Sequence, residues 1–417
     1  MKKGILSLAI ASLAICAFAT NYTDGVFIVN EDWFGHNASS VNFYSFTDGE
    51  MVYRAFQKEN PGRTLGNTTQ YANSDANNIY FCSKQNYGET GGRFDVVDAK
   101  TLQSKLSIAQ FSESGDTRAC YPFSDTKVYV GTTKGVYVVN PTTGETSGPI
   151  AGTSVKEPGA MELAGDKLIV CAQSKGVYVI DTTTDQLEKT VDVSTSTCAL
   201  FKVNDEIWVS VNNCTWGTPS ANNTEQFIKL DASTFEPEEP TTVPMACQNP
   251  AWAWKQTAPA IDEANKVLYY APADGGKFIS KYDMNTGEFT QEFISLPDGE
   301  QMYGNVIGFD AGYGKIVVET FEGYSSQNYH LHIYNTLGEE ESNMTLDANY
   351  WFPAMVMFAP KSVTPTDVAD IQGAKVVKSQ IYYNAAGQSS ATPFSGLNIV
   401  VTEYTDGSHN AIKQMVK

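Results

Sequence analysis

The segment Val136-Tyr137-Val138-Val139-Asn140-Pro141-Thr142-Thr143-Gly144 decides the fold, because it joins a short apolar strand to a polar turn and recurs along the chain. Each related strand ends in Ser, Asp or Asn and runs into a turn rich in Thr, Gly, Asp or Asn. The strand-ending residues are Ser45, Asp98, Asn140, Asp181, Asp231, Asp283 and Asn335. Their spacing of 41 to 53 residues is typical of a β-propeller, whose blades each hold four short strands.

The third repeat shows the internal pattern of one blade. Strands are predicted at 119–123, 127–131, 136–140 and 146–150, separated by short polar turns. Their β-branched and aromatic residues suit packed sheets. No amphipathic helix is expected beyond residue 19.

Seven repeats fit between residues 26 and 347, with six or eight blades as alternatives. Residues 26–56 have room for only three strands, whereas Tyr350–Phe358 is one strand too many. We therefore predict an all-β fold: a seven-bladed β-propeller over residues 20–360, closed by this C-terminal strand. Closure of the ring removes the free sheet edges of an open stack.

The two ends of the chain differ from the propeller. Residues 1–19 have a basic start, an apolar run and a small-x-small site at Ala17-Phe18-Ala19, which predicts a signal peptide cleaved before Thr20. A lipoprotein signal at Cys16 is the alternative. Residues 361–375 are predicted to be a linker, and residues 376–417 a small C-terminal β-sandwich-like domain.

The charge of the chain excludes some partners. The formal net charge of −19 becomes −21 when Lys2 and Lys3 leave with the signal peptide. A protein this acidic repels phosphates and anionic lipids. Neither nucleic acid nor a membrane surface is therefore an expected partner. No other segment is long and apolar enough to predict a membrane span.

Six cysteines remain after processing, an even number that predicts disulfides in an exported chain. Three fall on or at the end of second strands and three in or just before the first strand of the next blade. Sequential pairing would link adjacent blades as Cys82–Cys120, Cys171–Cys198 and Cys214–Cys247. Other connectivities remain open at this stage.

Aromatic residues gather in the loops of one propeller face, formed by the connections between second and third strands and between blades. Such loops on a rigid scaffold commonly carry function, and aromatic side chains provide large contact areas. Packing between the sheets is the alternative role for each ring. The predicted ligand-binding residues are Trp33, Phe34, His36, Tyr71, Asn73, Tyr87, Arg118, Trp216, Trp252, Trp254, Tyr303, Asn305, Tyr324, Tyr350 and Trp351.

Motifs for catalysis are lacking in the sequence. There is no nucleophile elbow, phosphate-binding loop or zinc-protease motif. His330 and His332 face the same way on one strand, but no partner acid for a metal site is evident. We therefore expect a binding protein with no catalytic residues, metal or cofactor, and keep an enzyme of the lactonase or quinoprotein-dehydrogenase type as the alternative.

The C-terminal stretch resembles the sorting domain of the Bacteroidetes type IX secretion system. The matching segments are Tyr383–Gln388, Ser395–Val401, Asp406-Gly407 and Lys413–Lys417. Asn398 stands where the family has an aromatic residue after Gly-Leu. The resemblance implies export through the outer membrane, followed by retention at the cell surface or release.

The propeller resembles the surface-exposed, cobalamin-binding propellers of gut Bacteroidetes, the BtuG-like group within the YncE-like family. The segments that carry this resemblance are 25–37 and 349–355, which are neighbours in the closed ring. The resemblance implies capture of cobalamin or another corrinoid as ligand and its transfer to a TonB-dependent outer-membrane transporter. A glycan- or protein-interaction module is a further alternative.

Overall fold

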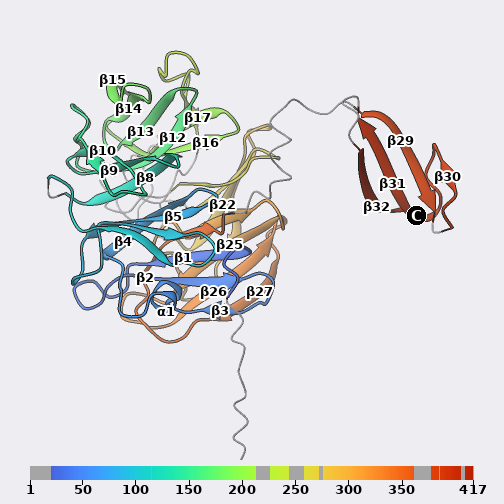
Figure 1. The fold of residues 1–417 in the computed structure, drawn as a ribbon, viewed down its shortest axis with the longest axis horizontal. Helices are drawn as coiled ribbons and strands as arrows, with labels where there is room; N and C mark the ends of the chain where they lie inside the picture. Colours follow the sequence, from blue (N-terminus) through green and yellow to red (C-terminus); the bar gives the residue numbers. More distant parts are fainter. Residues whose placement is uncertain are drawn as a thin grey trace, which may run out of the picture. The chain divides into compact units, whose positions relative to one another are not determined.

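The computed structural model describes residues 20–113, 115–212, 226–243, 258–271, 276–360, 377–384, 386–404 and 409–416. The chain divides into two compact units, residues 1–361 and residues 362–417. The described residues form strands, turns and loops, apart from one short helix, α1 (Ala55–Glu59) (Figure 1). None of their helices is long and apolar enough to cross a membrane.

The first unit is a propeller of seven antiparallel four-stranded sheets, which confirms the predicted fold (Figure 1). Blade one consists of β28 (Pro353–Phe358), β1 (Gly25–Asn30), β2 (Ser40–Ser45) and β3 (Met51–Val52). Blade two consists of β4 (Asn67–Ser74), β5 (Asn78–Gln85), β6 (Phe94–Asp98) and β7 (Ser104–Ile108). Blade three consists of β8 (Thr117–Ser124), β9 (Lys127–Thr132), β10 (Gly135–Val139) and β11 (Thr146–Ser147).

The other four blades repeat this arrangement. Blade four consists of β12 (Pro158–Ala164), β13 (Lys167–Ala172), β14 (Gly176–Asp181) and β15 (Gln186–Asp192). Blade five consists of β16 (Thr197–Val203), β17 (Glu206–Val211), β18 (Gln226–Lys229) and β19 (Thr241–Thr242). Blade six consists of β20 (Ala260–Asp262), β21 (Val267–Tyr270), β22 (Phe278–Asp283) and β23 (Phe289–Ser295). Blade seven consists of β24 (Ile307–Asp310), β25 (Lys315–Phe321), β26 (Tyr329–Asn335) and β27 (Glu340–Thr345).

The repeated turn residue has a local function in every blade. The side-chain oxygen of Asn140 accepts hydrogen bonds from the backbone N–H groups of Thr142 and Thr143, at 2.9 and 3.1 Å. Asp181 accepts the equivalent pair from Thr183 and Thr184, both at 2.9 Å. Equivalent side-chain bonds to turn N–H groups form at Ser45, Asp98, Asp231, Asp283 and Asn335. Each turn between the third and fourth strands is therefore fixed by its own first residue.

The ring closes in the first blade, where the C-terminal strand β28 pairs with β1 as predicted. The antiparallel register places Phe27 opposite Met357 and Ile28 opposite Val356, with an irregularity after Val29. Strand β1 is buried on both faces, because Phe27 packs with blade two and Ile28 with blade seven. Both rows of its side chains are consequently apolar, unlike a strand with one solvated face.

The second unit contains one four-stranded antiparallel sheet in its described residues. Its strands, in spatial order, are β30 (Ser389–Ser390), β29 (Val377–Asn384), β31 (Gly396–Tyr404) and β32 (His409–Val416). Asn398 is fully buried, and its side-chain amide bonds to the backbone N–H and C=O of Phe394, at 2.9 and 2.7 Å. This residue fixes the turn before β31, which accounts for a polar side chain at that position.

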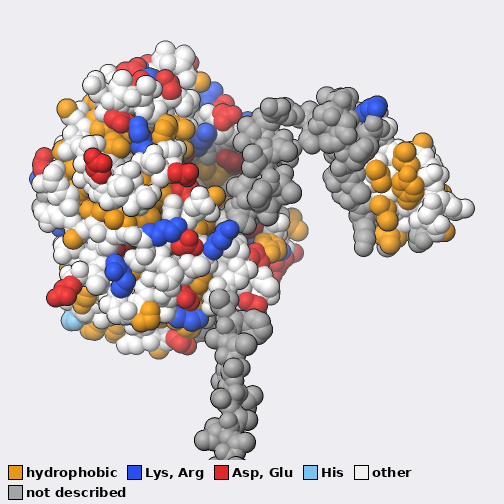
Figure 2. Space-filling view, viewed as in Figure 1, with side chains coloured by type: hydrophobic (Ala, Val, Ile, Leu, Met, Phe, Trp, Pro, Cys, Tyr) orange, Lys and Arg blue, Asp and Glu red, His pale blue; other side chains and the backbone are white. Residues whose placement is uncertain are grey.

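One face of this second sheet is apolar. Ile381, Leu397 and Ile399 are 40%, 45% and 43% exposed. Figure 2 shows hydrophobic side chains gathered on the sheet, whereas charges of both signs are scattered over the visible face of the propeller. The propeller therefore does not present a field of one sign on that face.

Cys82, Cys120, Cys171 and Cys198 are buried, and the structure contains neither a Cys82–Cys120 nor a Cys171–Cys198 disulfide. The predicted partners nevertheless lie close together across adjacent blades. Burial and a hydrogen bond with Cys120 raise the pKa of the Cys82 thiol, and burial and the charge of Cys198 raise that of Cys171. The thiols pack as small hydrophobic groups between the sheets. The third predicted pair, Cys214–Cys247, lies outside the described residues.

Asp95 on β6 is a buried carboxyl group, 1% exposed, within the second blade. Burial raises the pKa of Asp95 from 3.8 to about 7, although hydrogen bonds from Ser107 and the backbone of Gly92 act in the opposite direction. The folded protein therefore retains this proton over a pH range in which the unfolded chain has lost it. Its contribution to stability falls as the pH rises from 3.8 to about 7.

The Asp95→Asn variant should remove this part of the pH dependence. Relative to the wild type, its free energy of unfolding is expected to increase between pH 5 and pH 8, because only the wild type must bury a charge at the higher pH. Urea unfolding at both pH values measures the difference. A difference between the two proteins that is the same at pH 5 and pH 8 would contradict a raised pKa.

The neighbouring thiols should be able to form disulfide bonds under oxidising conditions. Refolding of the reduced, denatured chain in a glutathione redox buffer is expected to link Cys82 to Cys120 and Cys171 to Cys198, because the native fold brings each pair together. Peptide mapping without reductant identifies the links. A crossed link, such as Cys82 to Cys171, would show that the blades do not select the partners.

Candidate ligand-binding face

One end of the propeller is formed by the loops between second and third strands and by the connections between blades. In antiparallel sheets these segments lie at the same end of the strands. They include residues 31–39 between β1 and β2, and residues 346–352 between β27 and β28. We call this end the binding face.

The segments that adjoin the closing strands β1 and β28 are joined to each other at the binding face. Beyond the paired strands, the N–H groups of Glu31 and Asp32 donate to the carbonyls of Phe352 and Trp351, at 3.0 and 2.9 Å. The carboxylate of Asp32 is fully buried and pairs with Arg54 at 2.8 Å. Burial raises the pKa of Asp32 to about 6, which the charge of Arg54 partly offsets. The loop after β1 and the segment before β28 are thus held together.

Aromatic side chains from four loops meet beside this junction. The ring of Trp33 stacks on His36 at 3.9 Å and contacts Tyr350 at 4.8 Å. Tyr350 stacks on Phe352, which lies 5.3 Å from Tyr303. The cluster, here called the aromatic rim, comprises Trp33, Phe34, His36, Tyr303, Tyr324, Tyr350 and Phe352. Six of these seven are predicted site residues.

Part of the aromatic rim is open to solvent. Trp33 is 44% exposed, Phe34 61% and Tyr324 60%. Tyr87 joins a fifth loop to this region, because its hydroxyl donates to the backbone carbonyl of His36 at 3.2 Å. Large exposed aromatic side chains on a supported surface are typical of a binding site.

Trp351 lies inside the protein rather than on the aromatic rim. It is 3% exposed, stacks on Tyr53 at 5.7 Å and donates from its indole N–H to the carbonyl of Asp347 at 2.9 Å. The guanidinium of Arg54 lies 5.1 Å above the ring. This tryptophan packs between blades. It therefore has the packing role that the sequence analysis gave as the alternative to ligand contact.

Four other predicted site residues hold the blades together. Arg118 is 3% exposed and pairs with Glu157 at 2.7 Å, whereas Asn73 donates to the carbonyl of Cys120 at 3.0 Å. Tyr71 and Asn305 line a central hollow of about 30 Å³, too small for more than a water molecule. Tyr71 lies within β4, not in a connection as predicted. Trp216, Trp252 and Trp254 lie outside the described residues.

A wider hollow of about 430 Å³ opens next to the aromatic rim and is here called the mouth pocket. It is lined by Glu31, Phe34, Thr68, Lys84, Gln85, Asp116 and Tyr303. Sequence reasoning missed Lys84 and Asp116 because it weighted aromatic residues. Their positions were nevertheless informative, since Lys84 is the penultimate residue of a second strand and Asp116 precedes a first strand, at the same end of the blades.

The charges of the mouth pocket are only partly paired. The two carboxylate oxygens of Glu31 accept hydrogen bonds from the side chains of Gln70 and Tyr303, the second at 3.1 Å. Burial lowers the pKa of Lys84 to about 8, and the charge of Arg118 adds to this effect. The pocket therefore combines a desolvated ammonium group, carboxylates and an exposed aromatic ring.

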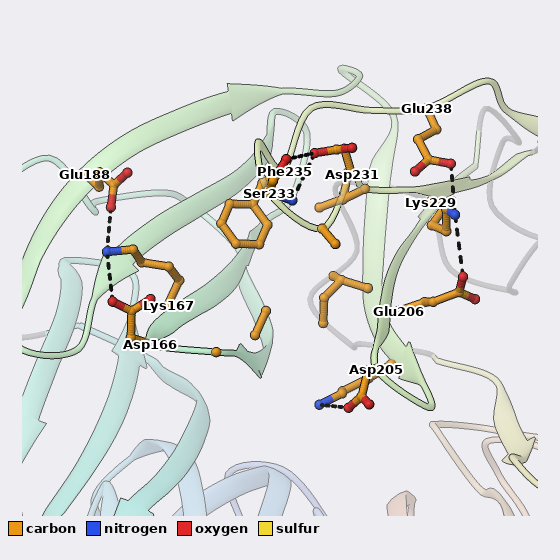
Figure 3. A pocket seen from close by; sticks show the side chains of 16 residues that line it. Asp166, Lys167, Glu188, Asp205, Glu206, Lys229, Asp231, Ser233, Phe235 and Glu238 are labelled. Carbon is orange, nitrogen blue, oxygen red and sulfur yellow. Dashed lines mark hydrogen bonds and ion pairs between the residues drawn. The ribbon is translucent and has the colours of Figure 1, made fainter.

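A larger hollow of about 560 Å³ lies at the opposite strand ends, between blades four and five (Figure 3). Its three lysines all have carboxylate partners. The pairs are Lys167–Glu188 at 2.9 Å, Lys202–Asp205 at 3.6 Å and Lys229–Glu238 at 3.1 Å. Because these side chains already satisfy one another, the hollow has less capacity for a ligand than its size indicates.

The histidine pair on β26 has acidic partners that sequence reasoning did not identify. The ring nitrogens of His332 lie 2.8 Å from Glu300 and 2.6 Å from Glu340, and His330 lies 3.2 Å from Glu322. Within the described ranges, no three His, Cys, Asp or Glu side chains have an arrangement suited to a metal ion. These contacts connect β26 to the neighbouring strand β27 and to the loops that carry Glu300 and Glu322.

Comparison with known proteins supports the fold. A family model described as "Domain of unknown function (DUF5074)" matches residues 24–359, and no curated protein matches the sequence. The dihydro-heme d1 dehydrogenase NirN in complex with DHE is similar at 11% identity and a TM-score of 0.50, over 84% of this chain and 78% of that one. The extracellular domain of the putative hybrid two component system BT4673 from B. thetaiotaomicron is similar at 13% identity and a TM-score of 0.50, over 84% and 46%.

The contrasting environments of two tryptophans predict different effects of their removal. Trp351→Ala is expected to cost about 3–5 kcal/mol of stability, because it leaves a cavity between blades. Trp33→Ala is expected to cost less than about 1 kcal/mol, because the ring is partly solvated. The midpoint of urea unfolding measures both. Equal losses would mean that the two rings are buried alike in solution.

Proposed function

This chain belongs to the DUF5074 family, and we propose that its propeller is an exported binding protein that captures cobalamin or a related corrinoid on the aromatic rim. The observation that carries the proposal is the exposed surface of Trp33 and Phe34 beside the mouth pocket. A corrinoid has a broad, flat macrocycle fringed with amides. Exposed rings would cover the macrocycle, while polar groups in the pocket bond to its periphery.

The rigidity of the rim also favours binding. Backbone hydrogen bonds join the segments that carry Trp33 and Tyr350, and Trp351 packs firmly beneath them. A surface that is already ordered loses little conformational entropy when a ligand binds.

We propose that the rim transfers its ligand to a TonB-dependent transporter at the outer membrane.

The proposed location is based on the C-terminal unit and on the signal-like start of the chain. We propose that residues 376–417 act as a type IX sorting domain and bring the propeller to the cell surface or the medium. Support comes from the resemblance of Tyr383–Gln388 and Ser395–Val401 to that domain. The separate four-stranded sheet is compatible with such a role.

Titration calorimetry with cyanocobalamin tests the proposal. The wild-type protein should release or absorb heat at micromolar concentration, and Trp33→Ala and Phe34→Ala should each weaken binding about tenfold or more, because each removes a large contact. Tyr313→Ala serves as the control, since this tyrosine is 53% exposed in the turn between β24 and β25, at the opposite strand ends.

Absence of heat from the wild type would remove the corrinoid assignment. Binding that survives both rim substitutions would move the site elsewhere on the propeller. A calcium-dependent esterase activity would instead favour the alternative of a lactonase-type enzyme, and binding of an oligosaccharide would favour a glycan-binding module.

A further inference from the structure

Two charged side chains of opposite sign line the mouth pocket and come from neighbouring blades. Lys84 is the penultimate residue of β5 in blade two. Asp116 directly precedes β8 in blade three. Neither residue belongs to the aromatic rim, and both face the space beside Phe34.

The backbone around both residues is held in place by one buried arginine. Arg93 is 8% exposed, and its Nη1 donates to the carbonyl of Lys84 and to that of Gly115, the latter at 2.8 Å. Asp116 is fixed further, because its N–H donates to the hydroxyl of Thr133 at 3.1 Å and its carbonyl accepts from the N–H of Thr133 at 3.0 Å. The two side chains therefore project from a rigid frame.

The two charges do not satisfy each other. In the part of the chain that the structure describes, neither the ammonium group of Lys84 nor the carboxylate of Asp116 makes a hydrogen bond or ion pair. They are near enough for Asp116 to raise the pKa of Lys84, yet farther apart than the roughly 4 Å of an ion pair. A group placed between them could bond to both.

The other charged groups nearby are already engaged. Glu31 accepts from Gln70 and Tyr303, and Arg118 pairs with Glu157. A partly desolvated charge without a partner gains more binding free energy from a new hydrogen bond than a charge that is already paired. Lys84 and Asp116 are therefore the charged groups in this pocket that a ligand would stabilise most. Lys84 can only donate hydrogen bonds, and an ionised Asp116 can only accept them.

We propose that Lys84 and Asp116 together bind a primary carboxamide of the ligand, with Lys84 donating to its oxygen and Asp116 accepting from its NH₂ group. This inference rests on the proposed binding role of the rim and specifies the chemical group that it selects. A carboxylate would bond to Lys84 but be repelled by Asp116 and Glu31. An amine would bond to Asp116 but be repelled by Lys84. A neutral carboxamide matches both.

Ligand-observed NMR titration of the full chain with N-acetyltryptophanamide and N-acetyltryptophan tests the selectivity. These probes share an aromatic body for the rim and differ in a terminal carboxamide or carboxylate. The wild type is expected to bind the amide at least about fivefold more tightly than the acid, because Asp116 repels the acid.

Two substitutions separate the roles of the charges. Asp116→Asn should abolish or reverse the preference for the amide, because the repulsion of the acid is lost while Lys84 remains. Lys84→Met should weaken binding of both probes. Asp125→Asn is the control, since Asp125 is an exposed carboxylate between β8 and β9, at the other end of the strand that follows Asp116. Circular dichroism establishes that each variant is folded.

Several results would overturn the inference: no binding of either probe at millimolar concentration, a wild-type preference for the acid, or an unchanged preference in Asp116→Asn. Cyanocobalamin distinguishes this failure from that of the proposed function. If it binds equally well to the wild type, Lys84→Met and Asp116→Asn, the carboxamide site is wrong and corrinoid capture stands. If it fails to bind while the amide preference holds, the corrinoid assignment alone is wrong.

Discussion

The pairing of β1 with β28 is the contact on which the rest of the propeller depends. Strand β1 is buried on both faces, with Phe27 packed toward blade two and Ile28 toward blade seven. Both rows of side chains are covered only when the ring is closed. The same junction extends through Asp32 and Trp351 into the loops of the binding face. The contacts that close the ring are consequently continuous with the contacts that support the aromatic rim.

The sequence predicts the fold well because its decisive interactions are local. Each repeated Asp, Asn or Ser bonds to the turn that follows it, as Asn140 does. The spacing of these residues in the sequence therefore gives the spacing of the blades. The site is less predictable. Trp33 and Trp351 belong to similar loop segments, but Trp351 is buried through contacts with Tyr53 and Arg54, which are distant in sequence. The approach of Lys84 and Asp116 likewise depends on the packing of two blades.

The two ends of the propeller use their charged residues differently. In the hollow between blades four and five, lysines such as Lys167 and Lys229 are neutralised by nearby carboxylates. In the mouth pocket, Lys84 and Asp116 lie close but unpaired within the described residues. Paired charges stabilise a surface without selecting a ligand, whereas separated charges define which groups fit between them. Size alone therefore does not identify the functional hollow.

Closure by β28 also sets the order in which the blades can be completed during synthesis. The partner of β1 is encoded more than three hundred residues after it, so a growing chain carries an incomplete first blade until Phe358 has emerged. Blades two to seven can form earlier, but the exposed edge of β1 remains open to other strands. A cell that makes this protein must therefore protect that edge, or keep the chain unfolded, until Phe358 has been translated.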